Sequence, residues 1–235
     1  KTAGQAIEGV KLGLRITEVV LEWVTRLAPI AVLGAVASAV GQTGFAAFKG
    51  LAYYVALGLG GLTLHVLITH HGWIWALGRS VRDFWREARE PVIYSIGANS
   101  SLATLPLTLK ALDRLKVSKE ASSLGACVGT NFNNDGIILY EAMAALVVTQ
   151  AMGMHLTLFE QIRVALLSLV AAMGIAGVPE AGFISLALVL GTLGLPTASL
   201  PLLLTVDWII ARGRSAVNVT ADMVVSMAVD GKVRR

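Results

Sequence analysis

Two long apolar segments of this chain are each interrupted near the middle, and this pattern restricts the fold more than any other feature. Residues 91–109 carry no charge but are broken by the sequence GANSS; residues 164–206 are apolar except for Glu180 and are broken by GIAGVPEAG. Backbone amides at such breaks have no helical partner, and a bilayer tolerates them only where protein or a water-filled cavity surrounds them. We therefore expect two helical hairpins that enter a membrane, turn and leave on the side they entered.

The remaining apolar runs and the composition also indicate a membrane protein. No charge lies between Arg26 and Lys49, or between Lys49 and Arg79, and each run is long enough for a spanning helix of about 20 residues. Only 14% of the residues are charged, against about a quarter in soluble domains. Lys and Arg lie in short loops, as topology signals do, so the net charge of +4 is no sign of a nucleic-acid partner. Residues 9–23 mix charged and apolar side chains at helical spacing, which indicates an amphipathic entry helix.

Each predicted hairpin is followed by a second interrupted segment. The expected order is hairpin, broken helix, hairpin, broken helix, over about residues 80–112, 118–153, 156–194 and 197–229. Interrupted apolar segments in matching positions of two halves are the best sequence pointer to a transporter binding site. The sequence thus predicts an all-α membrane protein. Residues 79–235 would hold two repeats in inverted topology, and residues 1–78 would supply the amphipathic helix and transmembrane helices before them.

Polar side chains gather at the first broken helix, in the sequence NFNNDG. Asn131, Asn133, Asn134 and Asp135 lie between two apolar runs with no linker on either side, so we favour a helix unwound inside the membrane over a surface turn. Unwound carbonyl groups, together with Asn133 and Asp135, are hard oxygen ligands that suit Na⁺. The cluster therefore predicts a cation site.

The last apolar segment carries ionisable residues, which are costly inside a membrane and usually functional. Asp207 and Arg214 are seven residues apart and share a helix face, so they could pair; Arg214, Asn218 and Asp222 follow at intervals of four. Because a guanidinium binds a carboxylate through two parallel hydrogen bonds, Arg214 indicates an anionic ligand. An internal salt bridge that merely neutralises Arg214 is the alternative.

Serine and histidine residues carry weaker signals. Ser100 and Ser101 could cap the second arm of the first hairpin, contact a ligand, or do both. His65, His70 and His71 lie in or at the end of a span with no carboxylate at metal-binding spacing, so we expect an interfacial role for them. No nucleophile elbow, phosphate-binding glycine loop or zinc motif is present, and we therefore do not expect an enzyme.

At four motifs the chain resembles the dicarboxylate/amino acid:cation symporter family, which includes the glutamate transporters. In order, NSSLATLP is similar to the tip of the family's first re-entrant hairpin, NNDGIILYE to its NMDGT motif, GIAGVPEAG to its second hairpin tip, and DWIIARGRSAVNVTAD to its last helix. The resemblance implies a homotrimeric secondary transporter, surrounded by lipid in a cytoplasmic (inner) or plasma membrane, that carries a small carboxylate with Na⁺ or, less expectedly, H⁺. The family's N-terminal helices have no counterpart here, so the chain corresponds to the transport half.

The resemblance also implies roles for individual residues. Those implied to coordinate cations are Gly129, Asn131, Asn133, Asp135, Ala172, Met173, Ile175, Asn218 and Asp222. Those implied to bind substrate carboxylates are Ser100, Ser101, Val178, Gly182, Arg214, Ser215 and Asn218. Asp135 would belong to a site beneath the substrate and Asp222 to a second site, while backbone carbonyls would form a third that the second hairpin closes.

Three positions depart from the family pattern. Ala211 stands where amino-acid transporters have an Asp for the substrate amine, Ile137 where they have a Thr, and Leu102 where they have a third hairpin Ser. Loss of the amine partner with Arg214 retained favours a dicarboxylate. A sodium-coupled symporter of acidic or neutral amino acids, and a binding or sensor paralogue that does not transport, remain the alternatives. Glu180 adds a negative charge at the tip of the second hairpin, which the resemblance implies is the extracellular gate.

Overall fold

The computed structural model describes residues 46–175, 181–195 and 200–233, with single positions outside these ranges. The regular elements in the described residues are all helical, which confirms the all-α class. Residues from Phe48 onward form one compact unit. The amphipathic helix expected at residues 9–23 lies outside the described ranges.

The first described helix is long and apolar. α2 (Ala46–His65), the π-helical segment η1 (Val66–His70) and α3 (His71–Ala76) follow one another without a break. Within the described part of the chain, Lys49–Ala76 is the one run long and apolar enough to cross a membrane. Several of its large apolar side chains are exposed, as a lipid-facing surface requires: Tyr53, Leu64, Leu67, Ile68 and Trp75.

The interruption GANSS forms a tight turn between two packed helices. α4 (Val81–Ala98) ends at Asn99, which adopts the left-handed conformation with φ 49° and ψ 39°, a region that Asn enters more readily than most residues. Ser100 then caps α5 (Ser101–Arg114), because its hydroxyl accepts a hydrogen bond from the backbone N–H of Ala103 at 3.1 Å. The predicted capping role of Ser100 is confirmed.

Two asparagines separate the next helices. α6 (Lys119–Ser122), the π-helical segment η2 (Ser123–Val128) and α7 (Gly129–Phe132) form one continuous run. Residues 133–134 then leave the helical conformation, and α8 (Asp135–Ala151) begins directly after them. The polar cluster NFNNDG thus lies at a junction between two helices, with no surface loop around it.

The last helices differ from the sequence prediction in one respect. α9 (Leu158–Met173) and α10 (Ala181–Thr192) pack against each other and against α8. α11 (Leu200–Val233) is a single helix of 34 residues, so the break predicted within residues 197–229 is wrong. The polar stretch of α11 contains no proline, and its side chains find partners on neighbouring elements, so nothing interrupts its i→i−4 hydrogen bonds.

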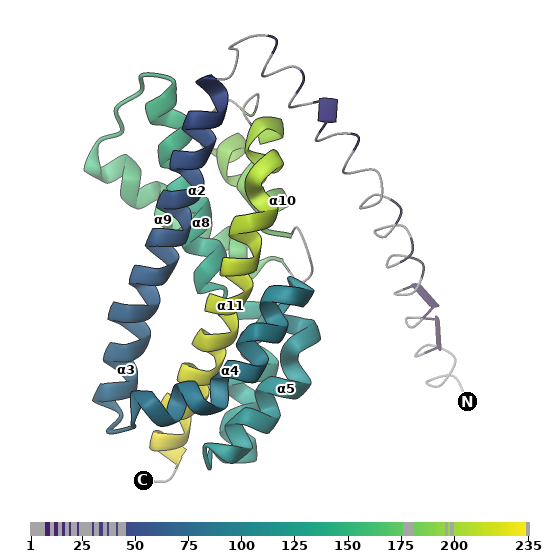
Figure 1. Cartoon of the computed structure of the whole chain (residues 1–235), viewed down its shortest axis with the longest axis vertical. Helices are drawn as coiled ribbons and strands as arrows, with labels where there is room; N and C mark the ends of the chain where they lie inside the picture. Colours follow the sequence, from purple (N-terminus) through teal and green to yellow (C-terminus); the bar gives the residue numbers. More distant parts are fainter. Residues whose placement is uncertain are drawn as a thin grey trace. The chain divides into compact units, whose positions relative to one another are not determined.

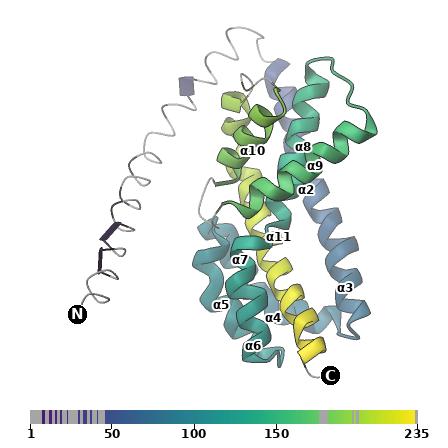
Figure 2. The same ribbon diagram turned by 180° about the vertical axis from the view of Figure 1, so that it is seen from behind.

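α11 runs the length of the unit and packs against α3 to α8 and α10 (Figures 1 and 2). Two apolar clusters form along it. One contains Tyr140, Leu190 and Ile210 and joins α11 to α2, α8 and α10. The other contains Phe84 and Met223 and joins α11 to α3, α4, α5 and α6. The polar residues of α11 lie where one cluster gives way to the other.

Candidate functional site

Arg214 is buried on α11 and bound to Asp207 of the same helix. Its two terminal nitrogens donate to the two carboxylate oxygens at 3.1 and 2.9 Å, and both side chains are buried. The guanidinium carbon lies 4.0 Å from the centre of the Tyr140 ring of α8. A Cβ atom on Gly182 would lie 3.0 Å from Nη1, so glycine allows α10 to approach Arg214 closely. The predicted pairing of Asp207 with Arg214 is confirmed.

This salt bridge is the arrangement that we kept as the alternative to ligand binding. The two interpretations are compatible in chemistry, because a guanidinium has five N–H donors and Asp207 accepts from two of its nitrogens. The salt bridge also lowers the free-energy cost of burying the Arg214 charge. Removing either partner of such a pair would leave the other as an uncompensated buried charge.

Asp222 of α11 faces the break between α7 and α8. Its Oδ1 accepts a hydrogen bond from Nδ2 of Asn133 at 3.2 Å and lies 2.9 Å from the position of a Cβ atom on Gly129. One turn earlier, Oδ1 of Asn218 accepts from the backbone N–H of Gly136 at 2.8 Å. Four residues implied for cation binding, Gly129, Asn133, Asn218 and Asp222, therefore come together from α7, the break and α11.

Asn134 joins three elements, although the sequence analysis assigned it no individual role within the predicted cation-site cluster. Its side chain is fully buried. Nδ2 donates to the carbonyl oxygens of Asn131 at 3.2 Å and Ala172 at 3.0 Å, and Oδ1 accepts from Asn218 at 3.4 Å. Two of the four carbonyls implied for the third cation site, those of Asn131 and Ala172, thus lie within reach of one amide group.

Two serines connect the turn between α4 and α5 to the break and to α11. The hydroxyl of Ser101 accepts from Thr130 of α7 at 3.3 Å, and the hydroxyl of Ser215 donates to Oδ1 of Asn99 at 3.2 Å. Both serines are buried. The turn therefore packs directly beside the polar residues of α7 and α11.

Other predicted residues lie at the end of α9 or fall outside the description. Met173 and Ile175 follow Ala172 there, and the role implied for them concerns their backbone carbonyls. Val178 and Glu180, at the predicted gate, lie outside the described residues.

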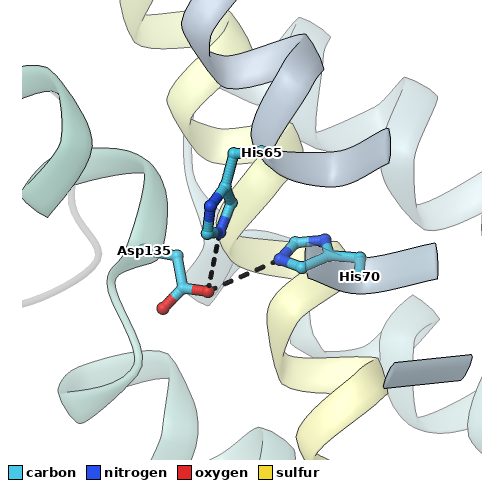
Figure 3. A group of neighbouring side chains, drawn as sticks. All are labelled: His65, His70 and Asp135. Carbon is cyan, nitrogen blue, oxygen red and sulfur yellow. Dashed lines mark hydrogen bonds and ion pairs between the residues drawn. The ribbon is translucent and has the colours of Figure 1, made fainter. Parts of the chain in front are cut away.

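Asp135, the first residue of α8, faces two histidines (Figure 3). Nε2 of His65 lies 3.2 Å and Nε2 of His70 lies 3.4 Å from the same oxygen, Oδ2 of Asp135. His70 is only 2% exposed. The interfacial role expected for His70 is therefore wrong, and His65 shares its contact with Asp135. They are 70 and 65 residues from Asp135 in sequence, so the fold alone brings them to it.

Sequence reasoning also missed Tyr140 and Glu141. Glu141 is fully buried in α8, and a carboxyl group inside an apolar run was a visible signal of function. Tyr140 had no such signal, because its contact with Arg214 depends on the packing of α8 against α11. An interrupted helix lined with buried polar side chains is typical of the binding sites of secondary transporters.

Known proteins point to the same class. The chain is 33% identical over 211 residues to a C4-dicarboxylate transport protein of Anaeromyxobacter sp. (strain K). The aligned region covers 89% of this chain and 48% of that protein. It is 36% identical over 174 residues to an excitatory amino acid transporter of Caenorhabditis elegans, covering 73% of this chain and 35% of that protein. It therefore spans about half the length of the bacterial relative and about a third of the animal one.

Residues 4–232 match the sequence model of the sodium:dicarboxylate symporter family. The chain belongs to this family, and the resemblance drawn from its four motifs is confirmed.

Proposed function

We propose that the protein to which this chain belongs is a secondary transporter that moves a small dicarboxylate across a cytoplasmic or plasma membrane together with Na⁺. Residues 79–235 would form the transport core, in which α4–α5 and α9–α10 act as re-entrant hairpins of two inverted repeats. Residues 1–78 would contribute scaffold helices, and the working assembly would be a homotrimer. Family membership supports the sodium coupling.

The observation that carries the proposal is the environment of Asp222. Its carboxylate is 2% exposed, and among the described residues it accepts a hydrogen bond from Asn133, a neutral amide. A buried carboxylate without a counter-charge is unfavourable, whereas a hard cation supplies that charge and takes oxygen ligands. The side chains of Asn133 and Asn218 and the carbonyls of the break offer such ligands. Na⁺ would therefore enter as a co-substrate held between α7 and α11.

The substrate side of the proposal rests on Arg214 and Ala211. Arg214 offers a planar cation beside the glycine backbone of α10, which suits a carboxylate. Ala211, three residues earlier on the same helix, is buried at 1% exposure and offers no carboxylate to a substrate amine. This combination favours a C4-dicarboxylate over an amino acid. The identity of 36% to an animal excitatory amino acid transporter keeps a sodium-coupled amino-acid symporter as the second candidate.

Uptake into proteoliposomes tests the proposal. Full-length protein is reconstituted, and labelled succinate uptake is measured with an inward Na⁺ gradient, with a choline gradient, and with excess unlabelled aspartate. We expect succinate uptake in the Na⁺ gradient but not in the choline gradient, and we expect excess aspartate to reduce that uptake only weakly. Strong competition by aspartate would favour the amino-acid symporter. Sodium-dependent succinate binding without uptake would indicate the non-transporting paralogue, and equal uptake in choline would contradict sodium coupling.

A further inference from the structure

An irregularity in the first described helix brings two histidines onto one face. His65 ends α2 and His70 ends η1, five residues later. In a regular α-helix, side chains five residues apart point about 140° away from each other. The π-helical segment pairs residue i with residue i+5, an arrangement that is rare and frequent at functional sites. The two rings therefore meet edge to face, with their centres 5.0 Å apart.

Hydroxyl groups behind the rings orient them toward Asp135. The Thr220 hydroxyl donates to the carbonyl oxygen of Val217 at 2.8 Å and lies 3.0 Å from Nδ1 of His70. A hydroxyl has one hydrogen, so where it donates to Val217 its oxygen accepts from His70, and Nδ1 carries the proton in that tautomer. The Thr69 hydroxyl lies 3.3 Å from Nδ1 of His65. Such outer partners are what fix the orientation of metal-binding histidines.

In that tautomer the Nε2 lone pair of a neutral His70 faces a carboxylate oxygen of Asp135, whereas in the other tautomer Nε2–H donates to it. The two atoms are 3.4 Å apart, and two electron-rich atoms at that distance require a positive charge between them or on one of them. A second proton on the ring would supply this charge, and so would a metal ion.

The distances from Asp135 to the two histidines fit a metal ion. Zinc binds imidazole nitrogen and carboxylate oxygen at about 2.0–2.2 Å, so two tetrahedral ligands lie about 3.3 Å apart. Oδ2 of Asp135 lies 3.2 and 3.4 Å from the two Nε2 atoms, which matches this spacing. All three ligand atoms lie within 4.8 Å of one another, so the two imidazoles would close in on a bound ion. A cavity of about 630 Å³, lined by His70, Asn133 and Asp135 among others, adjoins them and can admit an ion and its water.

We propose that His65, His70 and Asp135 bind a divalent transition-metal ion of the zinc class, with water as the fourth ligand. Imidazole nitrogen selects zinc and its neighbours, whereas Na⁺ and other hard cations prefer oxygen. The three ligands come from α2, η1 and α8 (Figure 3). The ion would therefore fasten the apolar run of α2–α3 to α8.

One consequence rests on the proposed function, while metal binding itself does not. Asp135 is also implied to coordinate Na⁺, so the two ions would compete for its carboxylate. We expect micromolar Zn²⁺ to inhibit uptake, and inhibition to weaken as the Na⁺ concentration rises.

Binding is tested with the full-length protein, purified through a tag without histidine and kept in sodium-free choline buffer. Co²⁺ titration is followed by visible absorption, and Zn²⁺ titration by calorimetry. We expect one ion per chain and the absorption spectrum of tetrahedral Co²⁺. Loss of an outer partner typically costs about 10–100-fold in metal affinity. Thr220→Val should therefore weaken Zn²⁺ binding about tenfold, and His65→Gln should weaken it at least about a hundredfold.

His65 is the primary target because its side chain is 23% exposed, whereas that of His70 is buried at 2%. The matched control is His155→Gln, an exposed position in the linker after α8, which should bind Zn²⁺ as the parent does. Thermal unfolding of each variant without metal checks that the fold is retained. A featureless Co²⁺ titration, or equal Zn²⁺ affinity in His65→Gln and His155→Gln, would overturn the proposal. Sodium-dependent succinate uptake in such a protein would leave the transport function intact.

Discussion

If the proposed function holds, Arg214 binds both Asp207 and a substrate carboxylate. One substitution distinguishes these two roles. Arg214→Lys keeps a positive charge opposite Asp207 but loses the planar fork that binds a carboxylate bidentately. We expect succinate affinity to fall at least about tenfold, measured by calorimetry at fixed Na⁺, with little change in thermal stability. Unchanged affinity would show that Arg214 only neutralises Asp207.

Arg214→Ala is a poorer experiment, because it mixes binding with folding. It would leave Asp207, which is 0% exposed, as a buried carboxylate without its partner. Breaking a buried pair in this way typically costs about 3–5 kcal/mol.

Ala211 offers a gain-of-function prediction. Ala211→Asp places a carboxylate one turn before Arg214, where an amino group of the substrate would lie. We expect the preference between succinate and aspartate to shift toward aspartate, measured as the ratio of their dissociation constants. Ala211→Asn is the matched control, because it has the same shape without the charge. An identical ratio in both variants would remove the basis for the dicarboxylate assignment.

At this scale, sequence reasoning succeeds within one helix and fails across elements. The pairing of Asp207 with Arg214 could be predicted, because seven residues in a helix fix two side chains on one face. The hydrogen bond from Asn134 to Ala172 joins residues 38 apart, and no spacing rule reports it. No spacing rule predicts the contacts of Asp135 with His65 and His70 either. They also require a π-helical segment, and no sequence pattern predicted it.

Among the elements, η2 and α11 approach each other most tightly at a glycine. A Cβ atom on Gly125 would lie 2.5 Å from the backbone N and Cα of Ser226, and backbone cannot yield as a side-chain end can. Gly125→Ala should therefore cost about 1–3 kcal/mol of stability, as overpacking typically does. Gly191→Ala is the control, because nothing lies within 4 Å of its Cβ position. Thermal unfolding in detergent compares the two. Equal melting temperatures would contradict the close contact.

The unwinding of one helix and the continuity of another show where element prediction stops. Both the NFNNDG stretch and the polar stretch of α11 are rich in small polar residues, and we expected both to break. In the structure the break lies at Asn133 and Asn134, and α11 satisfies it: the side chain of Asn218 accepts from Gly136, and that of Asp222 from Asn133. α11 thus supplies partners for one backbone N–H and one side chain at the break. Which of the two facing helices unwinds is decided by their packing, and the sequence cannot show it.

For the whole molecule, the proposed function predicts reciprocal coupling. If Na⁺ lowers the dissociation constant of succinate by some factor, succinate must lower that of Na⁺ by the same factor. Calorimetric titrations of each ligand with and without the other measure both factors. Asp222→Asn should reduce both together, because the buried charge that attracts the ion is gone. If Na⁺ and succinate changed each other's dissociation constants by different factors in the parent protein, the proposed equilibrium coupling between the two sites would be contradicted.

α11 belongs to both apolar clusters, and this affects how the chain can be assembled during synthesis. Ile210 and Val217 complete the cluster shared with α2, α8 and α10, while Met223 and Met227 complete the one built on α3 to α6. A chain emerging from its N-terminal side has made every other member of both clusters before α11 follows. Neither cluster can close until that helix arrives. A ribosome that stopped near residue 200 would therefore release a product with two unfinished interiors, and both would be exposed to chaperones and proteases at once.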